Sequence, residues 1–262
     1  MSTVVPLTKL HGTRNDFILI DHRDRQFENY SALARSLCDR HSSIGADGLL
    51  VILPSERADV RMRIFNPDGS EAGMCGNGIR CVAAYLVEDG APRELRVETL
   101  AGAIETYARR NGDRYTVRVR LPAPQIMPAE ENPNGYVVQA GNPHVVIFGD
   151  TVEGVDLPAI GPVISSKYEG GANVHAAVRR AADRLEVRHW ERGVGPTLSC
   201  GTGAVAAAAA AIYRGIVQSP VSVVVPGGEL IVEWDGAGDA WLTGEAVRIF
   251  DTAVRYDGRV TH

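Results

Sequence analysis

Two cysteines stand in the same local motif and could do acid–base chemistry. Cys75 begins the run Cys-Gly-Asn-Gly and Cys200 begins Cys-Gly-Thr-Gly, and a stretch of helix-forming residues follows each run. A cysteine just before a helix lies near the positive end of the helix dipole, which favours a thiolate over a thiol. The following glycines let the backbone come close to a bound anion. Each motif therefore indicates a thiol beside an anion-binding helix start.

Two such thiols suit the inversion of a carbon atom next to a carboxylate. A thiolate on one face could remove the α-proton while a thiol on the other face returns one. Helix N–H groups would meet the charge that develops on the carboxylate. Other interpretations stay open at this point, namely two buried structural cysteines, a redox pair or a single nucleophilic cysteine. Cys38 and Cys81 fall inside predicted helices and are interpreted as packing residues.

The elements that must position these cysteines are mostly short strands. Alternating or clustered β-branched residues predict many strands, and only a few stretches have helical length and composition. The predicted helices are Tyr30–Arg40, Gly78–Glu88 and Gly203–Arg214. The predicted strands include Arg61–Phe65, Arg93–Thr99, Tyr115–Arg120, Val145–Phe148, Leu185–Trp190, Val221–Val225 and Leu230–Trp234.

The two halves of the chain repeat one pattern. The two cysteine motifs are separated by close to half the chain, and other polar residues precede each motif at matching distances. The matching pairs are Asn66 with Glu191, Asn15 with Asn142, and Gly45–Gly48 with Gly171–Val174. Four elements in phase predict duplication of a single domain rather than a coincidence between two glycine-rich helix starts.

The duplication predicts two similar domains. We place the first at residues 1–122 and the second at 123–262, with the extreme C-terminus crossing back to the first. The boundary follows from the prolines and glycine that gather between Leu121 and Gly135, as in a linker. A repeated domain would aim two helix starts at one cleft between the halves.

Length, composition and charge exclude several classes of protein. The chain has 262 residues, is 45% apolar and 23% charged, and carries a net charge of −5. These proportions are typical of a globular protein and exclude a disordered or fibrous chain. Without a run of Lys and Arg, a nucleic-acid or membrane partner is not expected, and a small molecule is. The apolar run from Gly203 to Tyr213 is too short to cross a bilayer, and nothing resembles a secretory signal, so a cytoplasmic location is expected.

Seven motifs together resemble those of the diaminopimelate epimerase family over essentially the whole chain. A single Cys-Gly-Asn-Gly run is a weak signal, but this ordered set is highly specific. The motifs are His11–Phe17, Gly45–Gly48, Arg63–Glu71, Met74–Cys81, Gly141–His144, Glu191–Gly193 and Ser199–Ala204.

The resemblance implies an α+β fold with two similar domains, each a curled, mostly antiparallel sheet around a central helix, and a site in the cleft between them. It implies interconversion of LL- and meso-2,6-diaminopimelate in lysine and peptidoglycan precursor biosynthesis, without pyridoxal phosphate or metal. Cys75 and Cys200 would be the catalytic acid–base residues, supported by His144 and Glu191. The substrate-binding residues would be Asn15, Asn66, Gly76, Asn77, Asn142, Asn173, Glu191, Arg192, Gly201 and Thr202. A homodimer is compatible with the resemblance.

Some positions depart from the family's common pattern. Arg14 replaces a small residue, Gly48 stands where some members carry glutamine, and Pro196 stands where many carry glutamate. Val174-His175 replaces a Val-Glu or Ile-Gly pair. These changes concern recognition of the distal end of the substrate and leave the cysteines and their glycines intact. A proline or hydroxyproline racemase with the same two cysteines is the alternative enzyme, and a catalytically silent metabolite-binding protein is the alternative outside enzymes.

Overall fold

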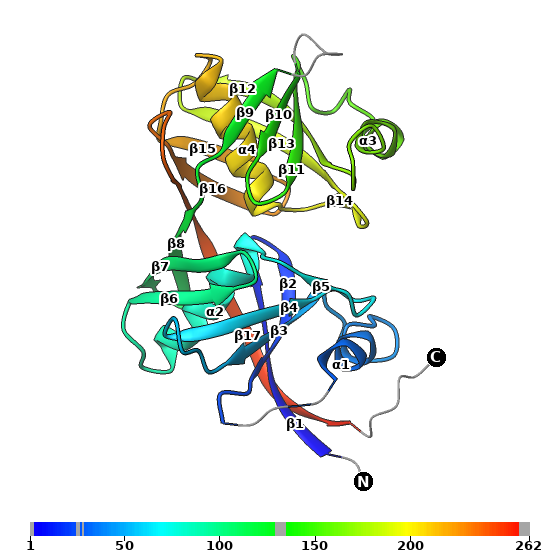
Figure 1. Cartoon of the computed structure of the whole chain (residues 1–262), viewed down its shortest axis with the longest axis vertical. Coiled ribbons are helices and arrows are strands. Elements are labelled where there is room, and N and C mark those ends of the chain that lie inside the picture. The colour runs from blue at the N-terminus through cyan, green and yellow to red at the C-terminus, as the bar shows by residue number, and fades with distance from the viewer. Residues whose placement is uncertain (1–2, 25–26, 28, 129–134, 257–262) are drawn as a thin grey trace. The chain divides into compact units, whose positions relative to one another are not determined.

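The computed structural model describes residues 3–24, 27, 29–128 and 135–256 (Figure 1). The chain forms two compact units, each described by itself below. Unit 1 comprises residues 1–119 and 245–262, and unit 2 comprises residues 120–244. The chain therefore passes out of unit 1 once and returns to it at the end.

Unit 1 is built from a sheet that curls around one helix. Strand β1 pairs with β2 in antiparallel fashion, β2 with β3 in parallel, and β3 with β4 in antiparallel. Strand β4 then runs parallel to β6, which continues into the antiparallel β6–β7–β8 meander. The strands are β1 (Thr3–Gly12), β2 (Asn15–Asp21), β3 (Gly48–Leu53), β4 (Val60–Phe65), β5 (Glu71–Ala72), β6 (Glu94–Thr99), β7 (Gly102–Asn111) and β8 (Arg114–Leu121).

Unit 2 repeats the same series of pairings. Strand β10 is antiparallel to β11, β11 parallel to β12, and β12 antiparallel to β13. Strand β13 runs parallel to β15, which leads into the antiparallel β15–β16–β17 meander. The strands are β9 (Gln125–Pro128), β10 (Gly135–Gln139), β11 (Pro143–Phe148), β12 (Asn173–Ala181), β13 (Arg184–Glu191), β14 (Gly195–Thr197), β15 (Val221–Val225), β16 (Gly228–Glu233) and β17 (Ala240–Tyr256).

The matching order and direction of these pairings confirm the internal duplication. In both units the pairing sequence is antiparallel, parallel, antiparallel, parallel, antiparallel, and a helix crosses over between the first two parallel strands. That crossover is α1 (Tyr30–Leu37) in unit 1 and α3 (Leu157–Ser165) in unit 2. The predicted α+β class with a mostly antiparallel sheet in each half is therefore confirmed.

The central helices are α2 (Gly76–Glu88) and α4 (Gly201–Tyr213). Every residue of α4 from Gly201 to Ala211 is buried, and the alanines from 206 to 211 are completely so. Small side chains let strands approach a helix that is enclosed on all sides, so an alanine run fits this position. Helix α2 is enclosed in the same way over its first nine residues, among them Arg80.

The predicted helix limits need small corrections. Both central helices begin two residues earlier than predicted, because the cysteines are the N-caps and the first glycine already belongs to the helix. Helix α1 ends at Leu37 rather than Arg40, because the Asp39 side chain accepts hydrogen bonds from the N–H groups of His41 and Ser42 and starts a turn. All seven predicted strands are present, with ends within two residues of the prediction.

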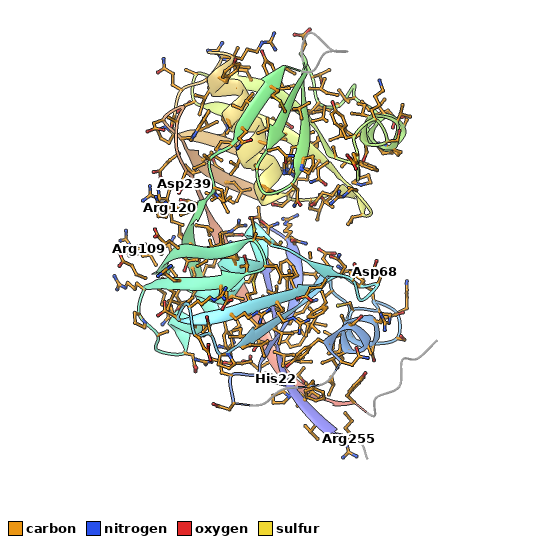
Figure 2. All side chains as sticks on the ribbon, viewed as in Figure 1. His22, Asp68, Arg109, Arg120, Asp239 and Arg255 are labelled. Carbon is orange, nitrogen blue, oxygen red and sulfur yellow. The ribbon has the colours of Figure 1, made fainter. Side chains whose placement is uncertain are left out.

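The predicted linker between Leu121 and Gly135 is partly structured. Residues 125–128 form strand β9, which pairs with β10, whereas residues 129–134 lie outside the described part of the chain. Before this strand, Arg120 pairs with Asp239 at 2.9 Å, and both residues are labelled in Figure 2. The contact fastens the start of unit 2 to the loop before β17.

The last strand, β17, is shared between the units. Its residues from Trp241 to Thr243 pair with β16, and its residues from Val247 to Tyr256 pair with β1. The predicted domain boundary between residues 122 and 123 stays a prediction. In the described part of the chain no helix is long and apolar enough to cross a membrane.

Candidate active site

Cys75 is the N-cap of α2. Its backbone is extended, with φ −143° and ψ 117°, and the Gly78 N–H donates to its Sγ at 3.4 Å. The first N–H groups of a helix have no partner within the helix, so Gly76 and Asn77 present theirs at the same end. The predicted cysteine at the start of a helix is therefore present in unit 1, and its thiol is half-buried.

Two of the predicted substrate-binding asparagines lie against this cysteine. Asn15 Oδ1 lies 3.9 Å from Cys75 Sγ and accepts a hydrogen bond from Asn77 Nδ2 at 3.1 Å. Asn15 Nδ2 in turn donates to Asp47 at 2.8 Å. Asn15 is therefore held at both ends of its amide group, which fixes the direction in which it faces the thiol.

A charged cluster lies beside Asn15 in the sequence and in space. Asp16 pairs with the buried Lys9 at 2.5 Å and with Arg40 at 2.5 Å, and Arg40 also reaches Asp47. Although burial acts in the opposite direction, hydrogen bonds from Arg40 and Lys9 lower the pKa of Asp16 to about 2. The cluster holds the start of β2, and with it Asn15, through charge-assisted bonds.

The hairpin that delivers Asn15 carries an unusual backbone. Thr13 has φ 53° and Arg14 has φ 62°, and both form the two-residue connection between β1 and β2. Such turns favour glycine or asparagine, because a side chain in the left-handed region clashes with its own backbone. Two non-glycine residues held this way at a candidate site indicate local strain that the surrounding contacts maintain.

Arg80 lies completely buried in α2, five residues after Cys75. Its guanidinium donates to Thr13 Oγ1 at 2.8 Å, to Asn77 Oδ1 at 2.9 Å, and to backbone carbonyl groups. All these acceptors are neutral, and no carboxylate lies within ion-pair distance of Arg80 in the described part of the chain. Burial lowers the pKa of Arg80, while the charges of Cys81, Cys75 and Glu245 raise it. A buried guanidinium without a direct ion pair among the described residues thus lies in this half of the chain.

Cys200 is the N-cap of α4 and is more deeply buried than Cys75, with 4% of its surface exposed. Its Sγ lies 3.7 Å from the Thr202 hydroxyl. Burial raises the pKa of Cys200 well above its usual value, and the charge of Glu191 adds to this rise. The Gly203 N–H and the Thr202 hydroxyl act in the opposite direction. The environment of Cys200 therefore favours the protonated thiol.

His144 lies in unit 2 at the end of a chain of three buried histidines. His144 Nδ1 lies 2.8 Å from His175 Nε2, and His175 Nδ1 lies 2.9 Å from His189 Nδ1. Burial lowers the pKa of His144 and of His189 to about 3, and it lowers that of His175 well below its usual value. A Cβ added to Gly203 would lie 2.6 Å from His175 and 3.1 Å from Cys200 Sγ. Glycine at this position therefore lets the histidine chain pack against the start of α4.

The remaining predicted substrate-binding residues are spread more widely. Asn173 Oδ1 accepts a hydrogen bond from the Arg192 backbone at 2.9 Å, and the Arg192 side chain bonds to the Gly170 and Gly171 carbonyls. Asn66 donates to Ser70 at 2.9 Å within its own turn. Asn142 is half-buried in the turn before β11. Among the described contacts, neither Asn66 nor Asn142 bonds to a cysteine or to its immediate partners.

The contacts around Cys75 and beside the start of α4 include three residues that were not predicted from the sequence, namely Arg80, His175 and His189. Arg80 was visible as a charged residue in a helix predicted to be enclosed. His175 and His189 lie on two neighbouring strands, and each faces the core as every second residue does. A signal existed, because both histidines fall on the apolar face of their strands.

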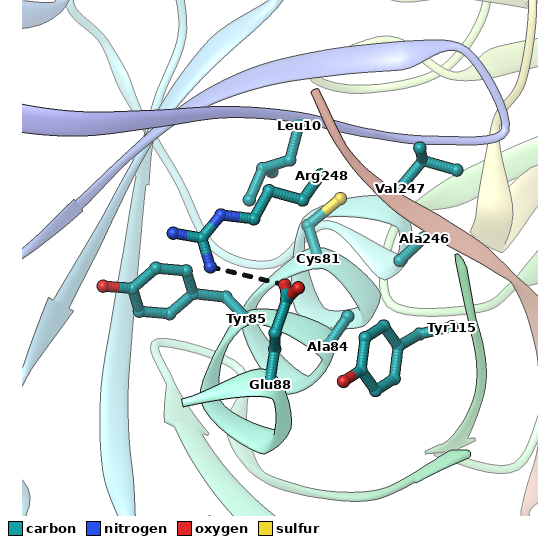
Figure 3. A pocket seen from close by; sticks show the side chains of 9 residues that line it. All are labelled: Leu10, Cys81, Ala84, Tyr85, Glu88, Tyr115, Ala246, Val247 and Arg248. Carbon is teal, nitrogen blue, oxygen red and sulfur yellow. Dashed lines mark hydrogen bonds and ion pairs between the residues drawn. The ribbon is translucent and has the colours of Figure 1, made fainter. Parts of the chain in front are cut away.

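The two other cysteines are buried, as packing residues would be. Burial raises the pKa of Cys38 to about 12 and that of Cys81 further. Figure 3 shows Cys81 lining a small pocket over the second half of α2, where Arg248 pairs with Glu88 at 3.3 Å. None of the predicted site residues lines this pocket. Among the described side chains, no group of three or more His, Cys, Asp and Glu is arranged to hold a metal ion.

Comparison with known proteins identifies close relatives. A family model described as diaminopimelate epimerase matches residues 7–126 and 136–249. The chain is 42% identical over 269 residues to the diaminopimelate epimerase of Desulforudis audaxviator, covering 93% of this chain and 97% of the relative. It is 41% identical to that of Archaeoglobus fulgidus, covering 96% of each.

Solved structures show the same fold at low sequence identity. A PhzF-family phenazine biosynthesis protein from Bacillus anthracis has a TM-score of 0.76 at 18% identity and covers 96% of this chain and 99% of its own. A hydroxyproline epimerase from Agrobacterium vitis, solved with trans-4-hydroxy-L-proline, also has a TM-score of 0.76, at 16% identity, covering 98% and 93%.

Proposed function

Because the chain belongs to the diaminopimelate epimerase family, we propose that Cys75 and Cys200 are the acid–base pair with which it interconverts LL- and meso-2,6-diaminopimelate. The observation that carries this proposal is that both cysteines cap the equivalent helix of the two repeats. The family places the enzyme, an isomerase, in lysine and peptidoglycan precursor biosynthesis. Inversion needs a base on one face of the carbon and an acid on the other, and a thiol from each repeat would supply them.

The helix starts supply the electrostatic part of the mechanism. Removing the α-proton moves negative charge onto the neighbouring carboxylate, which needs preorganised donors. Backbone N–H groups of Gly76 and Asn77 would bind it from one repeat, and those of Gly201 and Thr202 from the other. The proposal requires both helix starts to engage a single bound substrate.

The surroundings of the two cysteines support different resting protonation states. Buried, positively charged Arg80 favours a thiolate at Cys75, whereas burial and Glu191 favour a thiol at Cys200. In the direction that starts from this state, Cys75 removes the α-proton and Cys200 donates its proton to the opposite face of the carbon. The turnover leaves Cys75 protonated and Cys200 as thiolate, which is the starting state for the reverse direction.

The remaining roles concern the amino and distal ends of the substrate. We propose that His144 and Glu191 support the thiols, and that Asn15, Asn66, Asn142, Asn173 and Arg192 bind the substrate. The amide of Asn15 beside Cys75 and the pairing of Asn173 with Arg192 support these roles. A cytoplasmic location and a homodimer stay proposals of the same kind.

The test is a proton NMR time course of LL-diaminopimelate with reduced protein in deuterium oxide and no added cofactor. We expect the α-proton signal to disappear as the meso isomer forms, and Cys75→Ser and Cys200→Ser each to slow this at least about a thousandfold. Cys81→Ser is the matched control, because Cys81 is buried in the same helix as the Cys75 cap, and it should retain activity.

The same experiment separates the alternatives. Exchange of the α-proton of proline or hydroxyproline, but not of diaminopimelate, would indicate a racemase with another substrate. An active Cys75→Ser or Cys200→Ser variant would contradict the two-thiol mechanism. The absence of exchange with every amino acid tried would favour a binding protein.

A further inference from the structure

Three histidines form a continuous hydrogen-bonded chain inside unit 2. They come from three neighbouring strands, with His144 on β11, His175 on β12 and His189 on β13. Each has at most 2% of its surface exposed. The central ring uses both nitrogens, one toward each neighbour, at 2.8 and 2.9 Å. The outer nitrogens, His144 Nε2 and His189 Nε2, are buried with no hydrogen-bond partner among the described residues.

The equivalent positions of unit 1 are apolar. Phe17 pairs with Gly48 across β2 and β3 as His144 pairs with Asn173 across β11 and β12. Leu50 pairs with Ile64 as His175 pairs with His189. A Cβ at Gly78 would touch Leu50, as one at Gly203 would touch His175. The fold can therefore fill these positions with Phe, Leu and Ile, and does not require the histidines.

Burial keeps all three rings neutral. Burial lowers the pKa of His144 and of His189 to about 3. The Ala140 backbone acts in the opposite direction on His144, whereas the charges of Arg192 near His144 and Arg188 near His189 lower the pKa further. A neutral imidazole carries one N–H and one acceptor nitrogen. In a chain of three neutral rings, the nitrogen that carries the proton in one ring therefore determines which nitrogen carries it in the other two.

Only two arrangements satisfy both hydrogen bonds. In the first, His189 Nδ1–H donates to His175 Nδ1, His175 Nε2–H donates to His144 Nδ1, and His144 carries its proton on Nε2. In the second, both bonds are reversed, His144 Nε2 is an acceptor, and His189 carries its proton on Nε2. Each arrangement holds three protons, one for each ring.

We propose that His175 and His189 are positioning residues that hold His144 in one orientation and let it present Nε2 as either a donor or an acceptor. The inference rests on the proposed role of His144 in supporting the thiols. A reversible two-base reaction starts from one protonation state in one direction and from the opposite state in the other. The histidine chain supplies both states of His144 without placing a charged imidazolium in a buried site.

The switch conserves protons. When His144 Nε2 gives up its proton, His175 Nε2 passes one to His144 Nδ1 and His189 Nδ1 passes one to His175 Nδ1. One proton is then taken up at His189 Nε2 from a water molecule of the solvent, which replaces the proton that left at His144 Nε2. Thr197 lies opposite His189 in β14, and its buried hydroxyl has no partner among the described residues, so this end of the chain is polar.

The first test is nitrogen NMR of the wild-type protein with ¹⁵N-labelled histidine. We expect His144, His175 and His189 to stay neutral from pH 8 down to about 5, and scalar couplings across both nitrogen–nitrogen hydrogen bonds. A charged ring at pH 6, or the absence of both couplings in the assigned spectrum, would overturn the proposal. This measurement requires no variant and is independent of the substrate.

The second test uses residues that the fold already accommodates in unit 1. His175→Leu and His189→Ile copy Leu50 and Ile64. We expect His175→Leu to lower kcat about tenfold or more in both directions, with KM changed less than about threefold, and to shift the His144 nitrogen signals. His189→Ile leaves His144 bonded to His175 and should have a smaller effect on kcat.

The control is His22→Leu, which removes a buried histidine of unit 1 that is hydrogen-bonded to Tyr30 at 3.1 Å. It should leave kcat and the His144 signals unchanged. A folded His175→Leu protein with wild-type kcat or unchanged His144 signals would overturn the inference. If the wild-type protein fails to epimerise diaminopimelate, the proposed function is wrong. The nitrogen–nitrogen couplings would still show whether the three histidines are hydrogen-bonded to one another.

Discussion

The start of α2 and the start of α4 have similar backbone conformations, but they differ in the side chain five residues after the cysteine. Behind Cys75 a buried guanidinium, Arg80, is bonded to neutral oxygens, and the fifth residue after Cys200 is the equally buried Val205. The neighbouring strands show the reverse difference in polarity. Unit 1 has apolar side chains at the three strand positions where unit 2 has its three neutral histidines. Duplication therefore kept the geometry of two helix starts, while a few side chains placed a buried guanidinium in unit 1 and a carboxylate, Glu191, whose charge acts on Cys200 in unit 2.

The difference teaches how a symmetrical scaffold can hold an acid and a base at once. Two identical environments would give both thiols the same proton affinity, so the state with one proton between them would have no preferred side. In the proposed mechanism, the buried guanidinium of Arg80 on one side and the carboxylate of Glu191 on the other would select which thiol is charged at rest. Replacing these side chains tests whether they cause the difference between the two cysteines.

The largest expected effect is on the reactivity of the two thiols. With iodoacetamide at pH 7, Cys75 should be alkylated at least about thirtyfold faster than Cys200, because a thiolate is the nucleophile and Cys75 is also the more exposed. Arg80→Met should slow alkylation of Cys75 about tenfold and move its pH profile upward. Peptide mass spectrometry over time measures both rates.

Controls for this experiment lie in the same helices. Val205→Met places the same side chain at the equivalent position of α4 and should leave alkylation of Cys75 unchanged. Arg80→Lys keeps the charge and should retain most of the reactivity. Equal alkylation rates of the two cysteines in the wild-type protein would contradict the assigned resting state.

A smaller effect is expected on stability in acid. Histidine in an unfolded chain binds a proton below pH 6.5, whereas the folded pKa of His144 and of His189 is about 3. Their contribution to stability is therefore complete above pH 6.5 and is lost as the pH falls from 6.5 toward 3. Between pH 7 and 5 the loss is about 2 kcal/mol for each of these histidines.

Urea unfolding at pH 7, 6 and 5 measures this loss. The double variant His175→Leu/His189→Ile leaves one histidine of the chain and should lose stability much less steeply than the wild type. Asp16 in unit 1 behaves differently, because its pKa is lowered to about 2, and its contribution is lost only below about pH 4. A wild-type stability that is flat between pH 7 and 5 would contradict the neutral histidine chain.

The smallest effect concerns the strained hairpin of unit 1. Arg14→Gly should raise the free energy of unfolding by about 0.5 kcal/mol, because relief of the left-handed strain outweighs the added freedom of glycine in the unfolded chain. Lys167→Gly, at an exposed residue just after α3, is a control without a left-handed backbone and should not stabilise the chain. Thermal unfolding of both variants gives the comparison.

The repeat and the cysteine caps could be predicted because they are local. Cys-Gly-x-Gly before a helix needs only a few neighbouring residues to be interpreted, and matching spacings then relate the two halves. The histidine chain could not, because it is assembled from three strands whose register is set by pairing across the sheet. The role of Arg80 could not be predicted for another reason. Its hydrogen-bond acceptors include Thr13 on a hairpin distant in sequence and the backbone of Glu245.

Other elements were missed because their sequences are ambiguous. Helix α3 contains Pro162 and Gly161, both poor helix formers, and Gly161 is required because a Cβ there would lie 2.6 Å from the Trp190 ring. Strand β9 ends in proline within a segment that was interpreted as a linker, and pairing with β10 makes it a strand. In both cases contacts with distant residues override the local preference.

The division of β17 also has a consequence for the order in which the chain can fold on the ribosome. All of unit 2 has been synthesised once residue 244 is made, whereas unit 1 still lacks the strand that covers β1. The Glu245 carbonyl that accepts from Arg80 belongs to this late strand. Unit 1 is therefore begun first and completed last, and a chain that stops at residue 244 lacks both the strand that pairs with β1 and the Glu245 carbonyl that accepts from Arg80.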